Sequence, residues 1–246
     1  MLNMNLYEHK EAILENGYTV INGIFSENEV AKIVKVVENI DTSKPIFRKS
    51  TDLFAIRQFL KEIPEIKDLI FNENVKEVIK EVFGDQYFVV KSIYFDKPET
   101  SNWYVAYHQD LTISVDKKEI LSGFGPWTTK QDQFGVQPPL DILENIYTIR
   151  IHLDDTDENN GALKVIPKSH RRGIYRTEEM DWNREIEEIG KVKRGGIMIM
   201  KPLIFHGSNR TVNGEKRRVI HIEFSDVQLQ SPLCWAEKMN IFTHNI

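Results

Sequence analysis

Two stretches of this sequence alternate between apolar and polar residues, as strands do when one face packs on a core and the other faces a polar space. In residues 147–153 the polar face carries Thr148, Arg150 and His152, between Tyr147, Ile149, Ile151 and Leu153. In residues 217–224 the polar face carries Arg217, His221 and Glu223, opposite Arg218, Ile220, Ile222 and Phe224. Two antiparallel sheets whose polar faces meet enclose a cavity wide enough for a metal ion, as in jelly rolls such as cupins. The sequence therefore predicts an α+β fold with a mainly β core, a double-stranded β-helix of the jelly-roll, cupin-like kind.

Helices are expected before these strands, packed on the outside of the barrel. Residues 8–16 are predicted to form a short helix ended by Gly17, and Ser26 with Glu29 forms a capping box that opens a helix through residue 40. Two more helices are predicted over residues 52–71 and 74–83, and the strands begin at residues 86–96. No repeat, low-complexity tract or Pro/Gly-rich linker divides the chain, so we expect residues 1–246 to form one domain.

Composition argues against several classes of protein. The chain has 246 residues, 41% of them apolar, which is enough to bury one sizeable core. A net charge of -5 with scattered basic residues gives no reason to expect a nucleic-acid partner. Cys234 is the single cysteine, and the sequence shows neither a signal-peptide pattern nor an apolar run of membrane length. We expect a cytoplasmic protein without a membrane or nucleic-acid partner, and its oligomeric state is left open.

Three side chains are candidate metal ligands: His108 and Asp110 in Tyr107-His108-Gln109-Asp110-Leu111, and His206 in Phe205-His206-Gly207-Ser208. Two imidazoles and one carboxylate on one face of an Fe(II) ion leave the opposite positions open for a co-substrate and dioxygen. A histidine two positions before an aspartate is weak evidence in a chain with 7 histidines, and His152 with Asp154 repeats the spacing. On this pattern alone, the two pairs compete for the metal.

Arg217 follows His206 by eleven positions, on the polar face of the second alternating stretch. Its planar guanidinium suits a two-point grip on a carboxylate, which a lysine can match only as a point charge. Arg217 is therefore predicted to bind one carboxylate of a dicarboxylate co-substrate.

With these residues the chain resembles the phytanoyl-CoA dioxygenase family of Fe(II)- and 2-oxoglutarate-dependent oxygenases. The resemblance also covers residues 15–20, 25–27, 103–111, 159–163 and 165–170, and its most specific part is the block from Asn159-Asn160-Gly161 to Pro167-Lys168-Ser169-His170. It implies that Leu153-Asp154-Asp155 ends a core strand, which assigns the metal to the pair at 108 and 110. It also implies that Ser208 assists Arg217 at the co-substrate. Arg150 falls where the family often places a tryptophan near the co-substrate, so it is a further candidate co-substrate residue.

The activity implied by the resemblance is hydroxylation of an unactivated C–H bond of a small-molecule substrate, with release of succinate and carbon dioxide. Asp110 favours hydroxylation, because halogenating relatives lack the carboxylate ligand. Two alternatives stay open. One is a redox-inert zinc or manganese hydrolase or isomerase on the same barrel. The other is a barrel that binds a small molecule without turnover.

Residues 112–145 separate the first two ligands from the next core strand and show no convincing periodicity. A segment of this length is usually functional or disordered, and its aromatic and glycine content favours a lid that closes over the substrate. The alternative is an insertion that packs on the outside of the barrel.

Overall fold

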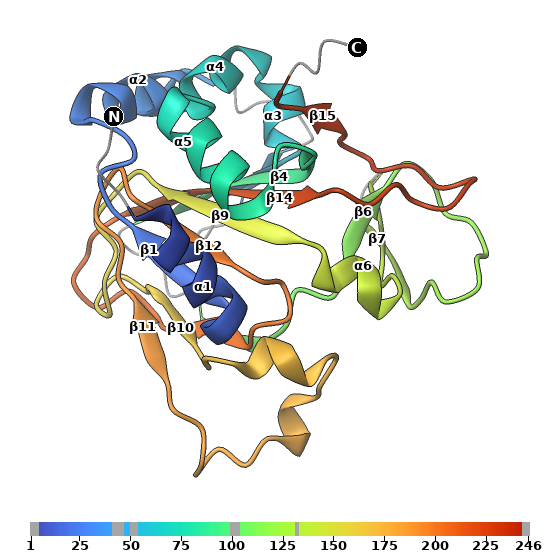
Figure 1. Ribbon diagram of the computed structural model, residues 1–246. Coiled ribbons are helices and arrows are strands. Elements are labelled where there is room, and N and C mark those ends of the chain that lie inside the picture. The colour runs from blue at the N-terminus through green and yellow to red at the C-terminus, as the bar shows by residue number, and fades with distance from the viewer. Residues whose placement is uncertain (1–4, 41–46, 50–53, 99–103, 131–132, 243–246) are drawn as a thin grey trace.

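The computed structural model describes residues 5–40, 47–49, 54–98, 104–130 and 133–242, and its core consists of antiparallel sheets (Figure 1). The larger sheet has eight strands in the order β1-β12-β9-β14-β4-β3-β2, with β15 paired to β4. Its strands are β1 (Tyr18–Ile21), β2 (Phe47–Lys49), β3 (Phe54–Arg57), β4 (Phe88–Lys97), β9 (Tyr147–His152), β12 (Ile197–Met200), β14 (Arg217–Ser225) and β15 (Met239–Asn240). The smaller sheet has the order β11-β10-β13-β5. Its strands are β5 (Val105–His108), β10 (Leu163–Val165), β11 (Glu188–Gly190) and β13 (His206–Ser208).

The two sheets pack face to face at one end of the barrel. Met198 and Met200 on β12 form a buried cluster with Leu163 and Val165 on β10. Further along the larger sheet, the face toward the smaller sheet carries polar residues instead. Its residues on β4, β14 and β9 include Lys91, Lys97, Arg217, His221, Glu223, Thr148, Arg150 and His152. The predicted jelly roll with a polar interior is confirmed.

The N-terminal helices cover the opposite face of the larger sheet, where the main hydrophobic core lies (Figure 1). Ile149 and Ile151 of β9 and Ile220 and Ile222 of β14 pack there against the helices. The helical elements of this part are α1 (Leu6–Asn16), α2 (Glu27–Glu38), α3 (Phe59–Glu62), η1 (Pro64–Ile66), α4 (Lys67–Ile70), α5 (Glu73–Val78) and the π-helical turn η2 (Ile79–Phe83). No helix among the described residues has the length and apolar character needed to cross a membrane.

The ends of the first two helices follow from their sequences. Gly17 ends α1 at φ 85°, a left-handed conformation that glycine adopts without the Cβ penalty of other residues. At the start of α2, the Ser26 side chain accepts from the Glu29 N–H, and the Glu29 carboxylate accepts from the Ser26 N–H. The predicted helices over residues 8–16 and 26–40 are therefore confirmed, with α2 ending at Glu38.

The single helix predicted over residues 52–71 is wrong. Residues 52 and 53 lie outside the described part of the chain, and Phe54–Arg57 forms strand β3, which pairs with β4 along the larger sheet. After β3 come three short helical turns, α3, η1 and α4, rather than one helix. Pro64 opens η1, and a proline inside a longer helix removes one backbone donor and clashes with the preceding turn.

Residues 112–145, whose sequence shows no convincing periodicity and for which a lid was predicted, contain regular structure among the described residues. They contain the three-stranded sheet β6-β8-β7 and the short helix α6. The bounds are β6 (Ile113–Val115), β7 (Trp127–Lys130), β8 (Gln133–Val136) and α6 (Leu140–Glu144). Ile113, Val136 and Leu143 share a hydrophobic cluster with Val90 of β4 and Trp235 near the C-terminal end. The apolar residues of this segment therefore build a small core of their own beside the barrel.

Replacing Ile222, which is 1% exposed in the main core, with alanine should lower the free energy of unfolding by about 2–5 kcal/mol, because the cavity adds to the lost transfer energy. Urea unfolding measures this change. Ile189→Ala is the matched control at a position that is 38% exposed, where we expect a loss below about 1 kcal/mol. Equal losses in the two variants would contradict the burial of β14 under the helices.

Candidate active site

The strands that carry the predicted metal ligands are neighbours in the smaller sheet. β13 and β5 pair antiparallel with His206 opposite His108, and the two imidazole rings lie 4.3 Å apart between centroids. Asp110 follows β5, where its N–H donates to the Pro202 carbonyl oxygen over 2.9 Å. One carboxylate oxygen of Asp110 lies 3.7 Å from His108 Nε2, and the other lies 3.6 Å from His206 Nε2. The three side chains thus offer ligand atoms within 4.8 Å of one another.

Backbone carbonyls orient both imidazoles in the same way. His108 Nδ1 lies 2.8 Å from the Ala106 carbonyl oxygen, and His206 Nδ1 lies 2.9 Å from the Ile204 carbonyl oxygen. A carbonyl can only accept, so each Nδ1 carries the proton and each Nε2 presents a lone pair to the shared centre. Metal-binding histidines are usually oriented by such a hydrogen bond from the second ring nitrogen.

The charge states of the cluster also suit a metal ion. Burial lowers the pKa of His206 to about 4, so this imidazole is neutral at physiological pH. Burial of Asp110 favours its neutral form, but His206, His221, Lys91 and His108 outweigh that effect and hold the carboxyl pKa well below its usual value. Neutral imidazole and ionised carboxylate are the forms that bind metals. Two imidazoles and one carboxylate are the donor set of mononuclear non-haem Fe(II) sites, so these residues fit iron.

The second pair with the same spacing does not form such a cluster. His152 Nδ1 lies 2.8 Å from the Thr156 hydroxyl, whereas Asp154 binds Arg218 on the other side of the sheet, with 2.7 Å between Oδ1 and Nη2. Residues two positions apart share one face only within a strand. Because β9 ends at His152, Asp154 lies beyond the strand and its side chain does not follow that of His152. Within the described ranges, the one group of three potential ligands is the cluster of His108, Asp110 and His206.

Gln109, between the first two ligands, is a structural residue that the sequence analysis missed. Its side-chain amide donates to the Gly173 and Leu203 carbonyl oxygens over 2.8 and 2.7 Å, and its carbonyl accepts from the Tyr175 N–H over 3.0 Å. It is 7% exposed and points away from the ligands on either side. Gln109 therefore ties the ligand turn to two other loops.

Arg217 faces the barrel interior, as the alternation predicted, and is buried. It donates to the Gly161 carbonyl oxygen, and Lys97 Nζ donates to the Asn209 carbonyl oxygen over 2.9 Å. Burial and the proximity of Arg150 lower the Arg217 pKa, and burial with the proximity of Arg217 lowers the Lys97 pKa to about 8. Two cations that are shielded from water at one end of the interior make an attractive site for an anion.

Lys97 was also missed in the sequence. It lies directly opposite Arg217 in the register of the neighbouring strands β4 and β14. The register between two strands far apart in the chain decides this pairing, and a single sequence does not show it. The sequence signal that could have found Lys97 is the alternation of β4, which extends to Lys97 and places it on the same face as Ile93 and Phe95.

Gly161 belongs to the Asn159-Asn160-Gly161 motif, and its lack of a side chain allows Asn209 and Lys97 to approach closely. It has φ +82°, and a Cβ there would lie 2.7 Å from the Asn209 carbonyl oxygen and 2.9 Å from Lys97 Nζ. A larger residue would therefore displace the loop that holds Lys97 and Arg217.

Ser208 and Arg150 also lie inside the barrel. Ser208 is two residues after His206 on β13, so both side chains share one face of the strand, and its buried hydroxyl has no hydrogen-bond partner among the described residues. Arg150 lies opposite His221 in the register of β9 and β14, and its Nη1 donates to His221 Nδ1 over 3.1 Å. Trp103, part of the resemblance, lies outside the described residues.

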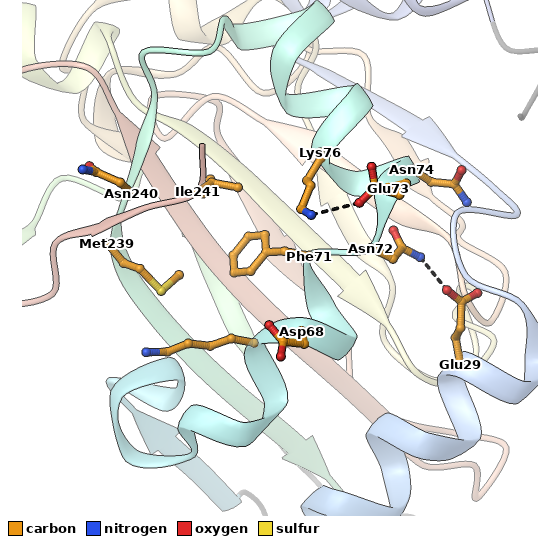
Figure 2. A pocket seen from close by; sticks show the side chains of 11 residues that line it. Glu29, Asp68, Phe71, Asn72, Glu73, Asn74, Lys76, Met239, Asn240 and Ile241 are labelled. Atoms are coloured by element: carbon orange, nitrogen blue, oxygen red, sulfur yellow. Dashed lines mark hydrogen bonds and ion pairs between the residues drawn. The ribbon is translucent and has the colours of Figure 1, made fainter. Parts of the chain in front are cut away.

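A groove of about 690 Å³ lies on the helical side of the larger sheet, between α4, α5 and the segment around β15 (Figure 2). Four of its polar side chains form two pairs with one another. Lys76 Nζ lies 2.9 Å from a Glu73 carboxylate oxygen, and the Asn72 amide donates to Glu29 over 2.9 Å. None of the predicted site residues lines this groove, so it is separate from the metal cluster.

A double-stranded β-helix that carries two histidines and one carboxylate on its smaller sheet is typical of mononuclear non-haem iron oxygenases. The family model described as phytanoyl-CoA dioxygenase (PhyH) matches residues 13–219, which include all three ligands and Arg217. The chain belongs to the phytanoyl-CoA dioxygenase family.

Individual relatives agree with this assignment. A protein of Stutzerimonas stutzeri described as a probable alpha-ketoglutarate-dependent hypophosphite dioxygenase is 24% identical over 182 residues, which cover 68% of this chain and 54% of the relative. The chain thus spans about half the length of that curated relative. EctD from S. alaskensis, solved with 2-oxoglutarate and 5-hydroxyectoine, has a TM-score of 0.70 at 20% identity and covers 92% of this chain and 78% of its own. The epimerase SnoN, solved with Fe3+, alpha ketoglutarate and nogalamycin RO, has a TM-score of 0.68 at 12% identity and covers 98% and 96%. These solved structures share the fold of this chain.

Removing one ligand should prevent tight metal binding. We expect His206→Ala and Asp110→Ala to weaken Fe(II) or Co(II) binding by more than about 100-fold, since even the loss of a supporting hydrogen bond can cost 10- to 100-fold. Anaerobic titration of the purified protein measures the affinity. His9→Gln is the control, because His9 lies on α1 and contacts Thr19 instead of the cluster. Unchanged affinity in either ligand variant would refute the assignment.

Proposed function

We propose that this protein is a non-haem Fe(II)- and 2-oxoglutarate-dependent dioxygenase that hydroxylates an unactivated C–H bond of a small-molecule substrate. The observation that carries the proposal is the convergence of His108, Asp110 and His206 inside a barrel that also buries Arg217. A metal site for hydrolysis has no need of a buried guanidinium that binds a second carboxylate. The combination supports a dicarboxylate co-substrate.

Each side chain has a distinct task in this proposal. His108, Asp110 and His206 hold the iron on one face and leave the remaining positions open. Arg217 binds the distal carboxylate of 2-oxoglutarate, assisted by the unpaired hydroxyl of Ser208 and by Lys97. Iron held by these residues would supply, with 2-oxoglutarate and dioxygen, the oxidising chemistry that ends in succinate and carbon dioxide. The protein supplies orientation and a site shielded from water.

Hydroxylation is the reaction that the ligand set favours. Asp110 would supply a carboxylate ligand where a halogenating enzyme would need room for a halide, so the ligand set suits oxygen transfer to carbon. The relatives include proteins named as an epimerase, a carbocyclase and a hypophosphite dioxygenase, so the family fold hosts several outcomes. The residues around the substrate decide among these outcomes.

The small sheet of residues 112–145 lies next to the site, since Lys91 on the inner face donates to the Thr112 carbonyl oxygen over 3.2 Å. We propose that this sheet contributes to the substrate side of the site.

The neighbouring arginines Arg217 and Arg218 provide a matched test of the co-substrate site. Arg217 faces the interior, whereas Arg218 points to the other side and binds Asp154. Arg217→Gln should weaken 2-oxoglutarate binding by about 10- to 100-fold, the loss of a charged hydrogen-bonded pair. Arg218→Gln should leave this affinity within about threefold while it lowers the melting temperature.

The measurement is the visible charge-transfer band of the protein loaded with Fe(II) and 2-oxoglutarate in the absence of air. Coupled succinate formation with candidate substrates follows in air, and Asp110→Ala should abolish it. Failure of the wild-type protein to form the band, or activity that continues without oxygen, would refute the proposed function in favour of a redox-inert enzyme.

The pH dependence of co-substrate binding should report Lys97. Its pKa is lowered to about 8, and the protonated form attracts the dianionic co-substrate. Affinity for 2-oxoglutarate should therefore be highest below the Lys97 pKa and fall as the pH rises through it, whereas the Arg217 guanidinium keeps its charge. Lys97→Met should bind 2-oxoglutarate more weakly at neutral pH and show a flatter profile between about pH 7 and pH 9.5. An identical slope in both proteins would exclude this role.

A further inference from the structure

Arg150 is a buried cation for which the described part of the chain offers no carboxylate in an ion pair. It is 8% exposed, and its Nε has no hydrogen-bond partner among the described residues. No ion pair joins it to an aspartate or glutamate within the described part of the chain, although Arg218 and Arg194, both outside the interior, have such partners. Burying a guanidinium without an anionic partner costs free energy, so an anionic ligand that accepts its hydrogen bonds would bind more tightly.

The position of Arg150 differs from that of Arg217. His221, the partner of Arg150 in register, is four residues from Arg217 on β14, which is about 13 Å along a strand. The Asp110 carboxylate interacts electrostatically with His221 and with Arg150. Arg150 therefore lies at the level of the metal cluster, whereas the backbone of Arg217 and Lys97 lies further along the strands. The two guanidinium groups are still close enough for Arg150 to lower the Arg217 pKa.

A chain of hydrogen bonds fixes the orientation of the Arg150 guanidinium. Because Arg150 donates to His221 Nδ1, the proton of His221 is on Nε2, which donates to Glu223 over 3.0 Å. Glu223 also accepts from Lys91 Nζ over 2.7 Å. All three partners belong to the larger sheet, His221 and Glu223 on β14 and Lys91 on β4. The network holds one edge of the guanidinium against the sheet and leaves Nε for another partner.

The balance of charge points to the kind of partner. On the inner faces of β4, β9 and β14, together with Asp110, the cations are Lys91, Lys97, Arg150 and Arg217, and the anions are Asp110 and Glu223. The described side chains therefore carry an excess of positive charge. Fe(II) and the 2-oxoglutarate dianion cancel each other, so loading them leaves this excess in place. One co-substrate carboxylate belongs to the metal and the other to Arg217, which leaves Arg150 for a third anionic group.

We propose that Arg150 binds a small oxyanion on the primary substrate, a carboxylate or a phosphorus oxyanion, so that the substrate of this enzyme is an anion. The proposal rests on the proposed function, because it takes the metal and Arg217 to be occupied by 2-oxoglutarate. Arg150 places the charged end of the substrate beside the metal. Glu223 and His221 act as positioning residues, since they orient Arg150 and contact no substrate themselves.

The test uses the whole protein loaded with Fe(II) and 2-oxoglutarate without air, titrated with hypophosphite, acetate, inorganic phosphate and, as a neutral control, ethylene glycol. We expect at least one oxyanion to perturb the visible band saturably and ethylene glycol to leave it unchanged. Arg150→Gln should weaken the oxyanion effect at least tenfold, the loss of a charged hydrogen bond. Arg150→Lys should restore part of it, because the charge returns without the planar fork.

Two controls separate substrate from co-substrate. Arg150→Gln should keep 2-oxoglutarate affinity within about threefold of the wild-type protein, in contrast to Arg217→Gln. Arg184→Gln removes the same charge from a side chain that is 85% exposed and should change neither affinity. Circular dichroism and the melting temperature check the fold of each variant, and Arg150→Lys carries the test if the glutamine variant does not fold.

Three results would count against the proposal in different ways. Loss of 2-oxoglutarate affinity in Arg150→Gln, equal to that in Arg217→Gln, would assign Arg150 to the co-substrate and overturn the substrate role. A normal band that no oxyanion perturbs would overturn the anionic substrate and leave the proposed function intact. Absence of the band in the wild-type protein would overturn the proposed function itself.

Discussion

The pairing of two short strands, β5 and β13, is the constraint on which the site depends. Their register places His108 directly opposite His206, and the turn after β5 brings Asp110 between them. Each imidazole is turned by a carbonyl of its own strand, so the backbone of the smaller sheet sets the direction of both lone pairs. Gln109 then ties the same turn to the Leu203 carbonyl just before β13. The metal geometry is thus a property of the sheet and its turns, with few side chains left to adjust.

The larger sheet contributes charge to the same interior. Its helical side carries the main hydrophobic core, which packs one face of β4, β9 and β14 against the helices and leaves the polar side chains of the other face directed inward. Burial separates Lys97, Arg150 and Arg217 from bulk water, and it shifts their pKa values downward. In such a low-dielectric space an anion is attracted more strongly than at a surface. The apolar core on one face of the sheet and the buried cations on the other are therefore two results of one alternating pattern.

The same pattern explains which parts of the molecule could be predicted from sequence. Residues 147–153 and 217–224 showed their two faces directly, so the jelly roll and the inward direction of Arg217 followed from periodicity. The first two helices were identifiable from Gly17 and from the Ser26–Glu29 capping box. Strand β3 was not, because its residues become a strand by pairing with β4, which lies more than thirty residues further along the chain. Lys97 and the partner of Arg150 were missed for the same reason, since both depend on the register between distant strands. Residues 112–145 form a sheet whose strands are three or four residues long, too short to show a period.

Arg217 and Arg218 are adjacent in sequence and point to opposite sides of β14, one toward the interior and the other toward Asp154. A slip of β14 by a single residue against its neighbours would exchange them and turn Ile220 and Ile222 of the helical core inward. The ion pair with Asp154 opposes that slip from outside the barrel. The same alignment that buries Ile220 and Ile222 therefore also decides which of two adjacent arginines enters the interior, so the charge of that space depends on the register of one strand.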